Sequence, residues 1–229
     1  MNAAVFASGS GSNFQALLDW EGRGALWRTR LLVVDRAGAG AVARAEKRGI
    51  PVRHVSGTKR AADEIAEEML AVLLEAHVDV IFLAGYLQLI PASVVAAFPR
   101  RILNVHPALL PAFGGRGMWG AAVHKAVLES GARVTGVTVH FVDEHYDEGR
   151  ILAQWPVPVH PGDDANALSE RVLRVEHLLY PLAAQHLCSA LAAGVEPSPL
   201  APPYEAFSSV DDLDGSVFTH LNQGAFRST

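Results

Sequence analysis

Short apolar runs alternate with amphipathic helical segments along the first hundred residues, and this alternation constrains the fold more than any other feature. Four runs that predict strands lie at residues 3–8, 30–35, 51–55 and 78–86. Segments with helical spacing separate them, at 13–24, 40–49 and 61–77. A further strand is predicted at 101–106, which like 78–86 is mainly apolar, as in strands covered on both faces. The order βαβαβαββ predicts an α/β fold with a doubly wound, mostly parallel sheet and helices on both faces, Rossmann-like and in a single domain.

The second half of the chain shows a different order of predicted helices and strands. It predicts a helix at 119–130, strands at 133–144 and 150–159, and one long helix at 163–194. Prolines in the last predicted strand place it at a sheet edge, and Pro181 predicts a bend in the long helix. Because no linker divides residues 1–195, we expect one domain there. Residues 196–229 turn to Pro, Ser and Asp and predict a tail at the surface.

Composition excludes several classes of protein. Half of the residues are hydrophobic, yet no run of about 18 apolar residues occurs, so we expect no membrane partner. The net charge is -5 and no Lys/Arg cluster is present, so we expect no nucleic-acid partner. The first residues lack the basic and apolar regions of a secretory signal. A single cysteine, Cys188, excludes an internal disulfide, and these features together predict a cytoplasmic protein.

A glycine-rich segment, SGSGSNF at residues 8–14, lies between the first predicted strand and helix. Backbone N–H groups and the helix dipole make such a turn an anion site. Gly9 and Gly11 match the first two glycines of a dinucleotide-binding fingerprint, but Phe14 stands at the third position. Asp35 ends the second predicted strand, where a ribose-binding acid would lie. A nucleotide-binding module and a tight turn without a ligand therefore both stay open.

Asn104 and His106 end the predicted strand at 101–106 and project from the same face, because side chains alternate along a strand. Ligands of open α/β sheets bind at the carboxyl ends of the strands. An amide and an imidazole placed there can stabilise an oxyanion or transfer a proton. Pro107 and Pro111 stiffen the segment that follows. A purely structural pair is the alternative.

The segment at 138–152 is dense in polar side chains. It contains His140, Asp143, Glu144, His145, Asp147 and Glu148. Neither H-x-x-x-H nor a pair of cysteines is present, so we predict no metal site. Asp147 precedes the turn at Gly149 and could return a carboxylate to the end of the sheet, where it would raise the pKa of a neighbouring imidazole. A solvated acidic turn is the alternative.

Three motifs in combination resemble the formyltransferase family that uses 10-formyltetrahydrofolate: SGSGSN, LNVHPALLP and TGVTVHFVDEHYDEGRILAQ. The resemblance covers residues 2–195 and is strongest to members that formylate 5'-phosphoribosylglycinamide (GAR) in de novo purine biosynthesis. It implies a formyltransferase catalytic domain at 1–195, with a phosphate-binding half at about 1–100 and a folate-binding, catalytic half at about 101–195. It also implies GAR and 10-formyltetrahydrofolate as small-molecule substrates, with no metal. A monomer and a homodimer both remain open.

The resemblance assigns the reaction to three residues. By position, the catalytic Asn, His and Asp of the family correspond to Asn104, His106 and Asp147. Asn104 and protonated His106 are then expected to stabilise the oxyanion of a tetrahedral intermediate. Asp147 is expected to keep His106 cationic and to help move the proton. Thr138 and His140 are expected to support the site.

The resemblance also implies the substrate contacts. GAR is expected to bind Gly11, Ser12, Asn13, Glu176 and a basic residue, Arg60 or Lys59. The folate is expected to bind Tyr86, Leu87, Gln88, Leu89 and Ile90, together with Asn104. The segment from Gly114 to Gly120 departs from the commoner family pattern, while His124 keeps the register. We therefore expect this loop to have a shape of its own.

Two other members of the family are alternatives. Formyltetrahydrofolate deformylase shares the Asn–His–Asp set but has an added N-terminal domain. Here the first predicted strand begins at about residue 3, so we expect no such domain. Methionyl-tRNA formyltransferase adds a basic C-terminal domain, which this sequence does not predict. A non-catalytic nucleotide-binding module would leave the Asn–His–Asp set unexplained.

Overall fold

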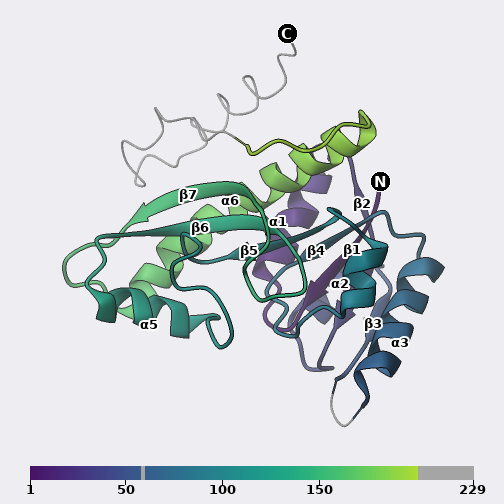
Figure 1. The fold of residues 1–229 in the computed structure, drawn as a ribbon, viewed down its shortest axis with the longest axis horizontal. Coiled ribbons are helices and arrows are strands. Elements are labelled where there is room, and N and C mark those ends of the chain that lie inside the picture. The colour runs from purple at the N-terminus through teal and green to yellow at the C-terminus, as the bar shows by residue number, and fades with distance from the viewer. Residues whose placement is uncertain (58–59, 201–229) are drawn as a thin grey trace.

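A computed structural model describes residues 1–57 and 60–200, and its centre is one seven-stranded sheet (Figure 1). The strands are β1 (Asn2–Ala7), β2 (Arg28–Val34), β3 (Val52–His54), β4 (Val80–Leu83), β5 (Ile102–His106), β6 (Val134–Phe141) and β7 (Ile151–Pro158). Their order across the sheet is β3-β2-β1-β4-β5-β6-β7. Strands β1 to β5 run parallel, whereas β6 is antiparallel to both of its neighbours. The predicted mostly parallel sheet is confirmed, with β7 at its edge.

Among the described residues, five helices connect strands and a sixth follows β7. They are α1 (Ser12–Glu21), α2 (Ala41–Lys47), α3 (Ala62–Glu75), α4 (Ala92–Ala97), α5 (Ala121–Ser130) and α6 (Ala165–Ala192). The predicted direct connection between the fourth and fifth strands was wrong, because α4 lies between them. With only six residues, α4 is too short to give a helical period in the sequence. Pro181 lies inside α6 and is buried there. None of the described helices is long and apolar enough to cross a membrane.

Side chains alternate across the sheet and fill two separate core layers. In β1, Ala3, Val5 and Ala7 join one layer, while Ala4 and Phe6 join the other. The first layer packs against α1, α2, α5 and α6, and the second against α3 and α4. This two-sided burial explains why the central strands have no polar face.

A close approach of two backbones fixes the turn between β1 and α1. Gly11 has a φ of 73°, which favours glycine, and a Cβ at this position would meet the Cα of Ala41 at 2.8 Å. Gly11 is therefore required by its conformation and by its surroundings. This contact holds the start of α1 against the start of α2.

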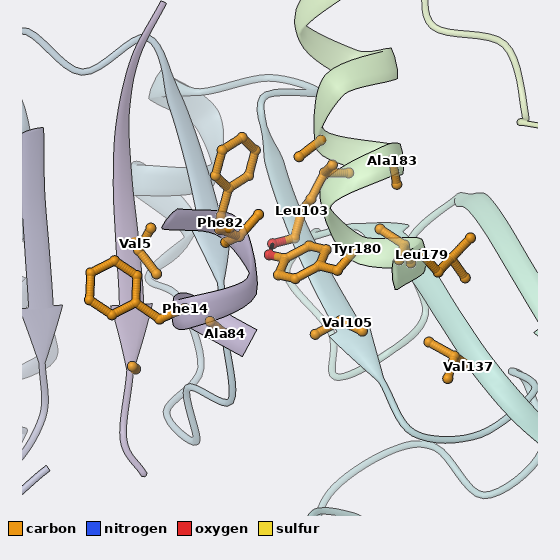
Figure 2. Close-up of a cluster of buried hydrophobic side chains, with 14 of the residues drawn as sticks. Val5, Phe14, Phe82, Ala84, Leu103, Val105, Val137, Leu179, Tyr180 and Ala183 are labelled. Carbon is orange, nitrogen blue, oxygen red and sulfur yellow. Dashed lines mark hydrogen bonds between the residues drawn. The ribbon is translucent and has the colours of Figure 1, made fainter. Parts of the chain in front are cut away.

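Tyr180 connects α6 to the middle of the sheet. Its hydroxyl lies 2.9 Å from the carbonyl oxygen of Leu83 and 3.0 Å from that of Leu103, so one proton is shared between β4 and β5. Figure 2 shows the ring crossing from α6 toward Leu103, and it packs edge-on against Phe82 with ring centres 6.3 Å apart. The hydroxyl is the polar link between the long helix and the strands that carry the site.

The chain after α6 returns to the edge strand. The backbone N–H of Leu200 donates to the carbonyl oxygen of Leu152 in β7, at 2.7 Å. Arg150 donates to the Glu196 carboxylate at 2.5 Å, and His186 contacts the carbonyl of Ser198 at 2.8 Å. Residues 196–200 of the predicted tail thus lie along β7 and α6. Its remainder, 201–229, lies outside the described residues.

Replacing Tyr180 with Phe should lower the free energy of unfolding by about 1–2 kcal/mol, because two buried carbonyls lose their shared donor. Urea denaturation measures the change. The matched control is Tyr146→Phe, which removes a hydroxyl from a side chain that is 38% exposed. Equal effects of the two substitutions would contradict the link assigned to Tyr180.

Candidate active site

A cavity of about 510 Å³ opens at the carboxyl ends of β1, β4 and β5. All three regions singled out in the sequence contribute to its wall, with residues of α6 closing it. The wall comprises residues 9–13, 83–90, 104–107, 115–120, 124, 140, 142, 145–147, 169, 173 and 176. Its size suits a small-molecule site.

Asn104, His106 and Asp147 meet in this cavity, as the sequence predicted. The Nδ1 atom of His106 lies 3.5 Å from Oδ2 of Asp147, and Nδ2 of Asn104 lies 3.5 Å from its Oδ1. Two of the residues come from β5, and Asp147 returns from the loop after β6. That return depends on Gly149, because a Cβ there would meet the carbonyl oxygen of Phe141 at 1.8 Å. The turn therefore aims one carboxylate at the end of β5.

His140 places a second imidazole beside the same carboxylate. It lies opposite Asn104 in the β5–β6 pairing, and its Nε2 is 3.1 Å from Nδ2 of Asn104 and 3.6 Å from Oδ1 of Asp147. Its Nδ1 faces the carbonyl oxygen of Phe141 at 2.9 Å, which assigns the proton of the neutral ring to Nδ1. His140 can then accept from Asn104 and orient the amide.

Thr138 fixes the proline-containing segment that follows β5. Its hydroxyl donates to the carbonyl oxygen of Ala108 at 2.7 Å and accepts from the N–H of Leu110 at 3.0 Å. The side-chain amide of Gln154 also donates to the hydroxyl oxygen of Thr138, at 3.0 Å. Thr138 thus acts on the site through the backbone next to His106.

The pKa of His106 is lowered from its ordinary value because burial disfavours the charged ring. Asp147 and the carbonyl of Phe113, which lies 2.8 Å from Nε2, act in the opposite direction but do not outweigh burial. In the free protein, the effect of Asp147 on the pKa of His106 is therefore smaller than the effect of burial. Desolvation of a ring that is only 3% exposed cannot be read from the sequence.

Asp147 itself is stabilised as an anion. Burial alone would raise its pKa, but the neighbouring His140 and His106 and the N–H of Gly115 lower it overall. The Gly115 N–H lies 2.9 Å from Oδ2. The cavity thus holds an ionised carboxylate between two imidazoles, which is suited to receive and pass on a proton.

Gly11, Ser12 and Asn13 form the start of α1 and lie in the cavity wall, so the predicted anion loop faces the same space. Asn13 donates to Oε2 of Glu176 at 2.6 Å. Burial raises the pKa of Glu176 to about 7, although the bond from Asn13 acts to lower it. Among the described residues, the buried Oδ1 of Asn13 has no hydrogen-bond partner. This wall offers backbone N–H groups, one carboxyl group and one unpaired amide oxygen.

Arg60 does not lie in the cavity wall, which corrects one expected contact. Its guanidinium pairs with Glu68 and lies 3.9 Å from the carboxylate of Glu64, so two acids of α3 hold it elsewhere. Lys59, the alternative, lies outside the described residues.

The segment from Tyr86 to Ile90 lines the cavity, as predicted. The N–H of Leu87 donates to the hydroxyl of Ser8 at 3.0 Å, which ties the segment to the end of β1. The side-chain amide of Gln88 donates to Asp35 at 3.2 Å. Asp35 is outside the cavity wall, so the ribose-binding role that a nucleotide module would give it has no support.

Sequence reasoning missed several residues of the wall. They are Arg116, Met118, Trp119, His145, Tyr146, Ser169 and Leu173. The unusual loop from Gly114 to Gly120 was noted, but nothing in its sequence showed that it turns toward the cavity. His124, which keeps the family register, is buried in the wall, and its Nδ1 has no partner within the described part of the chain. Burial lowers its pKa. Across residues 1–57 and 60–200, no three His, Cys, Asp or Glu side chains are grouped as metal ligands.

Comparison with known proteins assigns the fold and the family. The formyl transferase family matches residues 1–184. A crystal structure of glycinamide ribonucleotide transformylase 1 from Geobacillus kaustophilus is 42% identical, with a TM-score of 0.74 over 82% of this chain and 98% of that one. The corresponding enzyme from Symbiobacterium toebii is 38% identical, with a TM-score of 0.77 over 83% of this chain and 88% of that one.

A curated plant relative is similar as well. The chloroplastic phosphoribosylglycinamide formyltransferase of Arabidopsis thaliana is 50% identical over 180 residues, which are 77% of this chain and 62% of that protein. This chain thus spans less than two thirds of that relative's length. The family match covers most of the chain, including the glycine loop, the Asn–His pair and the acidic loop. The chain belongs to the formyl transferase family.

Proposed function

We propose that this chain transfers the formyl group of 10-formyltetrahydrofolate to the amine of 5'-phosphoribosylglycinamide. The observation that carries the proposal is the meeting of Asn104, His106 and Asp147 in the same cavity as the Gly11–Asn13 loop. One end has groups for acyl transfer and the other has groups for a phosphate. The names of the relatives and of the solved structures agree with phosphoribosylglycinamide as the formyl acceptor.

In the proposed complex the GAR phosphate lies at the start of α1. Backbone N–H groups of Gly11, Ser12 and Asn13 are its donors, and the helix dipole favours its charge. Glu176 closes this end, and its raised pKa keeps part of its population neutral near pH 7, which reduces repulsion of a phosphate. The folate lies along Tyr86–Ile90, with its formyl group at Asn104.

The GAR amine attacks the formyl carbon and forms a tetrahedral intermediate whose oxygen is negative. Asn104 and His106 are the donors toward this oxygen. His106 is neutral in the free protein, and the developing negative charge raises its pKa, since an opposite charge favours the imidazolium. His106 therefore takes up a proton from solvent as the intermediate forms and releases it when the oxygen becomes the carbonyl oxygen of the product. Ionised Asp147 receives the proton that the amine loses, and the proton then passes to N10 of the folate as the C–N10 bond breaks.

Hydrolysis of the formylfolate is the second candidate, because it would use the same three residues. The Gly11–Asn13 loop with Glu176 favours transfer over hydrolysis, since a water nucleophile needs no phosphate site. A cytoplasmic location stays part of the proposal, and both a monomer and a homodimer are compatible with it.

The proposal is tested by mixing purified protein with 10-formyltetrahydrofolate, with and without GAR, and following the folate product by absorbance. Turnover that requires GAR is expected. Equal turnover in the absence of GAR would assign the chain to the deformylases, and the absence of turnover in both mixtures would reject both activities.

Asp147→Asn should lower kcat by roughly 10²–10⁴-fold, because the proton loses its acceptor. Asn tolerates the φ of 58° at this position, so the loop should keep its path. Stopped-flow or steady-state absorbance measures kcat, and calorimetry should show that GAR still binds. The matched control is Asp143→Asn, which removes a carboxylate from the same loop outside the cavity wall. An Asp147→Asn protein with near-normal kcat would remove Asp147 from the proton path.

Glu176 predicts a pH dependence of stability. Its pKa rises from 4.5 in the unfolded chain to about 7 in the folded protein, so the folded state binds more protons in this range. The free energy of unfolding of the wild type should therefore fall as the pH rises from about 4.5 to about 7. Glu176→Gln should lack this component, which amounts to about 3 kcal/mol.

Urea denaturation from pH 4.5 to pH 8 compares the two proteins. Glu170→Gln, which removes an exposed carboxyl group from the same helix, is the control. If wild type and Glu176→Gln give parallel pH profiles, the buried neutral carboxyl group is refuted.

A further inference from the structure

The cavity has an uneven distribution of charge. Among the described residues in its wall, the ionised or ionisable acids are Asp147 and Glu176, and the one Lys or Arg is Arg116. Both substrates of the proposed reaction are anionic, since GAR carries a phosphate and a folate carries the two carboxylates of its glutamate tail. Arg116 can therefore bind the anionic group of only one substrate, and the anionic group of the other substrate must bind backbone N–H donors.

Arg116 is placed by the backbone on either side of it. The N–H of Gly115 is fixed by Asp147, and Phe113 is fixed through its carbonyl oxygen by His106. Gly115 and Gly117 have φ values of 95° and 87°, so the chain turns at both flanks of the arginine. The base of Arg116 is thus anchored at the reaction centre, while its exposed side chain lies in the cavity wall.

The guanidinium of Arg116 makes no hydrogen bond or ion pair with the residues that the structure describes. Within the described ranges, no carboxylate or carbonyl pairs with it, whereas Arg36, Arg48, Arg53, Arg60, Arg100 and Arg150 all have acidic partners. Gln88, the other long polar side chain of the folate wall, already donates to Asp35. Arg116 is therefore the group of this wall that is available to a ligand anion.

The position of Arg116 favours the folate over the phosphate. The Gly11–Asn13 loop follows β1, whereas Arg116 follows β5 and is anchored to Asp147 beyond β6, with β4 between the two loops. Trp119, on the same loop and 57% exposed, adds an uncovered aromatic face to the wall. An aromatic face and a guanidinium on one loop of the wall match an aminobenzoyl ring that ends in carboxylates.

We propose that Arg116 is a specificity-determining residue that binds the glutamate carboxylates of the folate, with Trp119 covering the aminobenzoyl ring. This inference rests on the proposed function, because it takes a formylfolate as the second ligand. The Gly114–Gly120 loop then supplies the cation that binds the folate tail. Asp147 and His106 hold the backbone next to Arg116 in place.

Equilibrium binding tests the inference without turnover. Isothermal titration calorimetry compares 10-formyltetrahydrofolate with the pteroate analogue that lacks glutamate, for wild type, Arg116→Gln and Arg116→Lys. Arg116→Gln should raise the Kd of the glutamate form about tenfold and leave the Kd of the analogue within about twofold of wild type. Arg116→Lys should restore part of the loss, because it keeps the charge but not the two-pronged geometry.

Lys125→Gln is the matched control, since it removes one positive charge from exposed α5 without touching the cavity wall. A Kd for the glutamate form that is unchanged in Arg116→Gln overturns the inference, as does an equal rise for both ligands. A selective rise in the Kd of GAR instead would assign Arg116 to the phosphate and would also overturn it. Wild-type protein that binds the folate but fails to consume it with GAR contradicts the proposed function alone.

Discussion

The carboxylate of Asp147 is the contact on which the geometry of the site depends. It lies between two imidazoles, His106 at 3.5 Å and His140 at 3.6 Å, and it also accepts the N–H of Gly115 at 2.9 Å. Through these contacts, one side chain joins the end of β5, the end of β6 and the loop that leads to α5. A buried negative charge is costly unless it is paired, and here one of the partners, His106, is also a group proposed for catalysis. Structural stability and chemistry therefore use the same interaction.

The two ends of the cavity shift the pKa of their carboxyl groups in opposite directions. At the Asp147 end the acid is kept ionised and the neighbouring His106 is kept neutral. At the Gly11–Asn13 end, burial keeps Glu176 close to neutrality. The difference comes from partners: Asp147 has several donors, whereas Glu176 has the amide of Asn13. One protein can thus have an ionised carboxylate at one end of a cavity and a partly protonated one at the other.

The fold was largely readable from the sequence because each central strand is mainly apolar and each long helix has a clear apolar stripe. The positions of Asn104, His106 and Asp147 at a strand end or beside a glycine turn were also readable, whereas their joint role was predicted only from the family resemblance. Other features depend on tertiary contacts. The pairing of Arg60 with Glu68, the approach of Arg116 to the cavity and the lowered pKa of His106 arise from distances and burial that no local pattern encodes. The short helix α4 was missed because six residues do not display a period.

The segment that runs from α6 to Leu200 has a consequence for how this protein meets other chains. An exposed edge strand presents free backbone groups on which another strand can add, and that is a route to aggregation. In β7, Pro156 and Pro158 have no N–H to offer, and the carbonyl oxygen of Leu152 is already taken by Leu200. The segment that ends at Leu200 thus covers part of the open edge of β7. Shortening it before Leu200 would leave a template for strand addition on the side of the sheet farthest from β3.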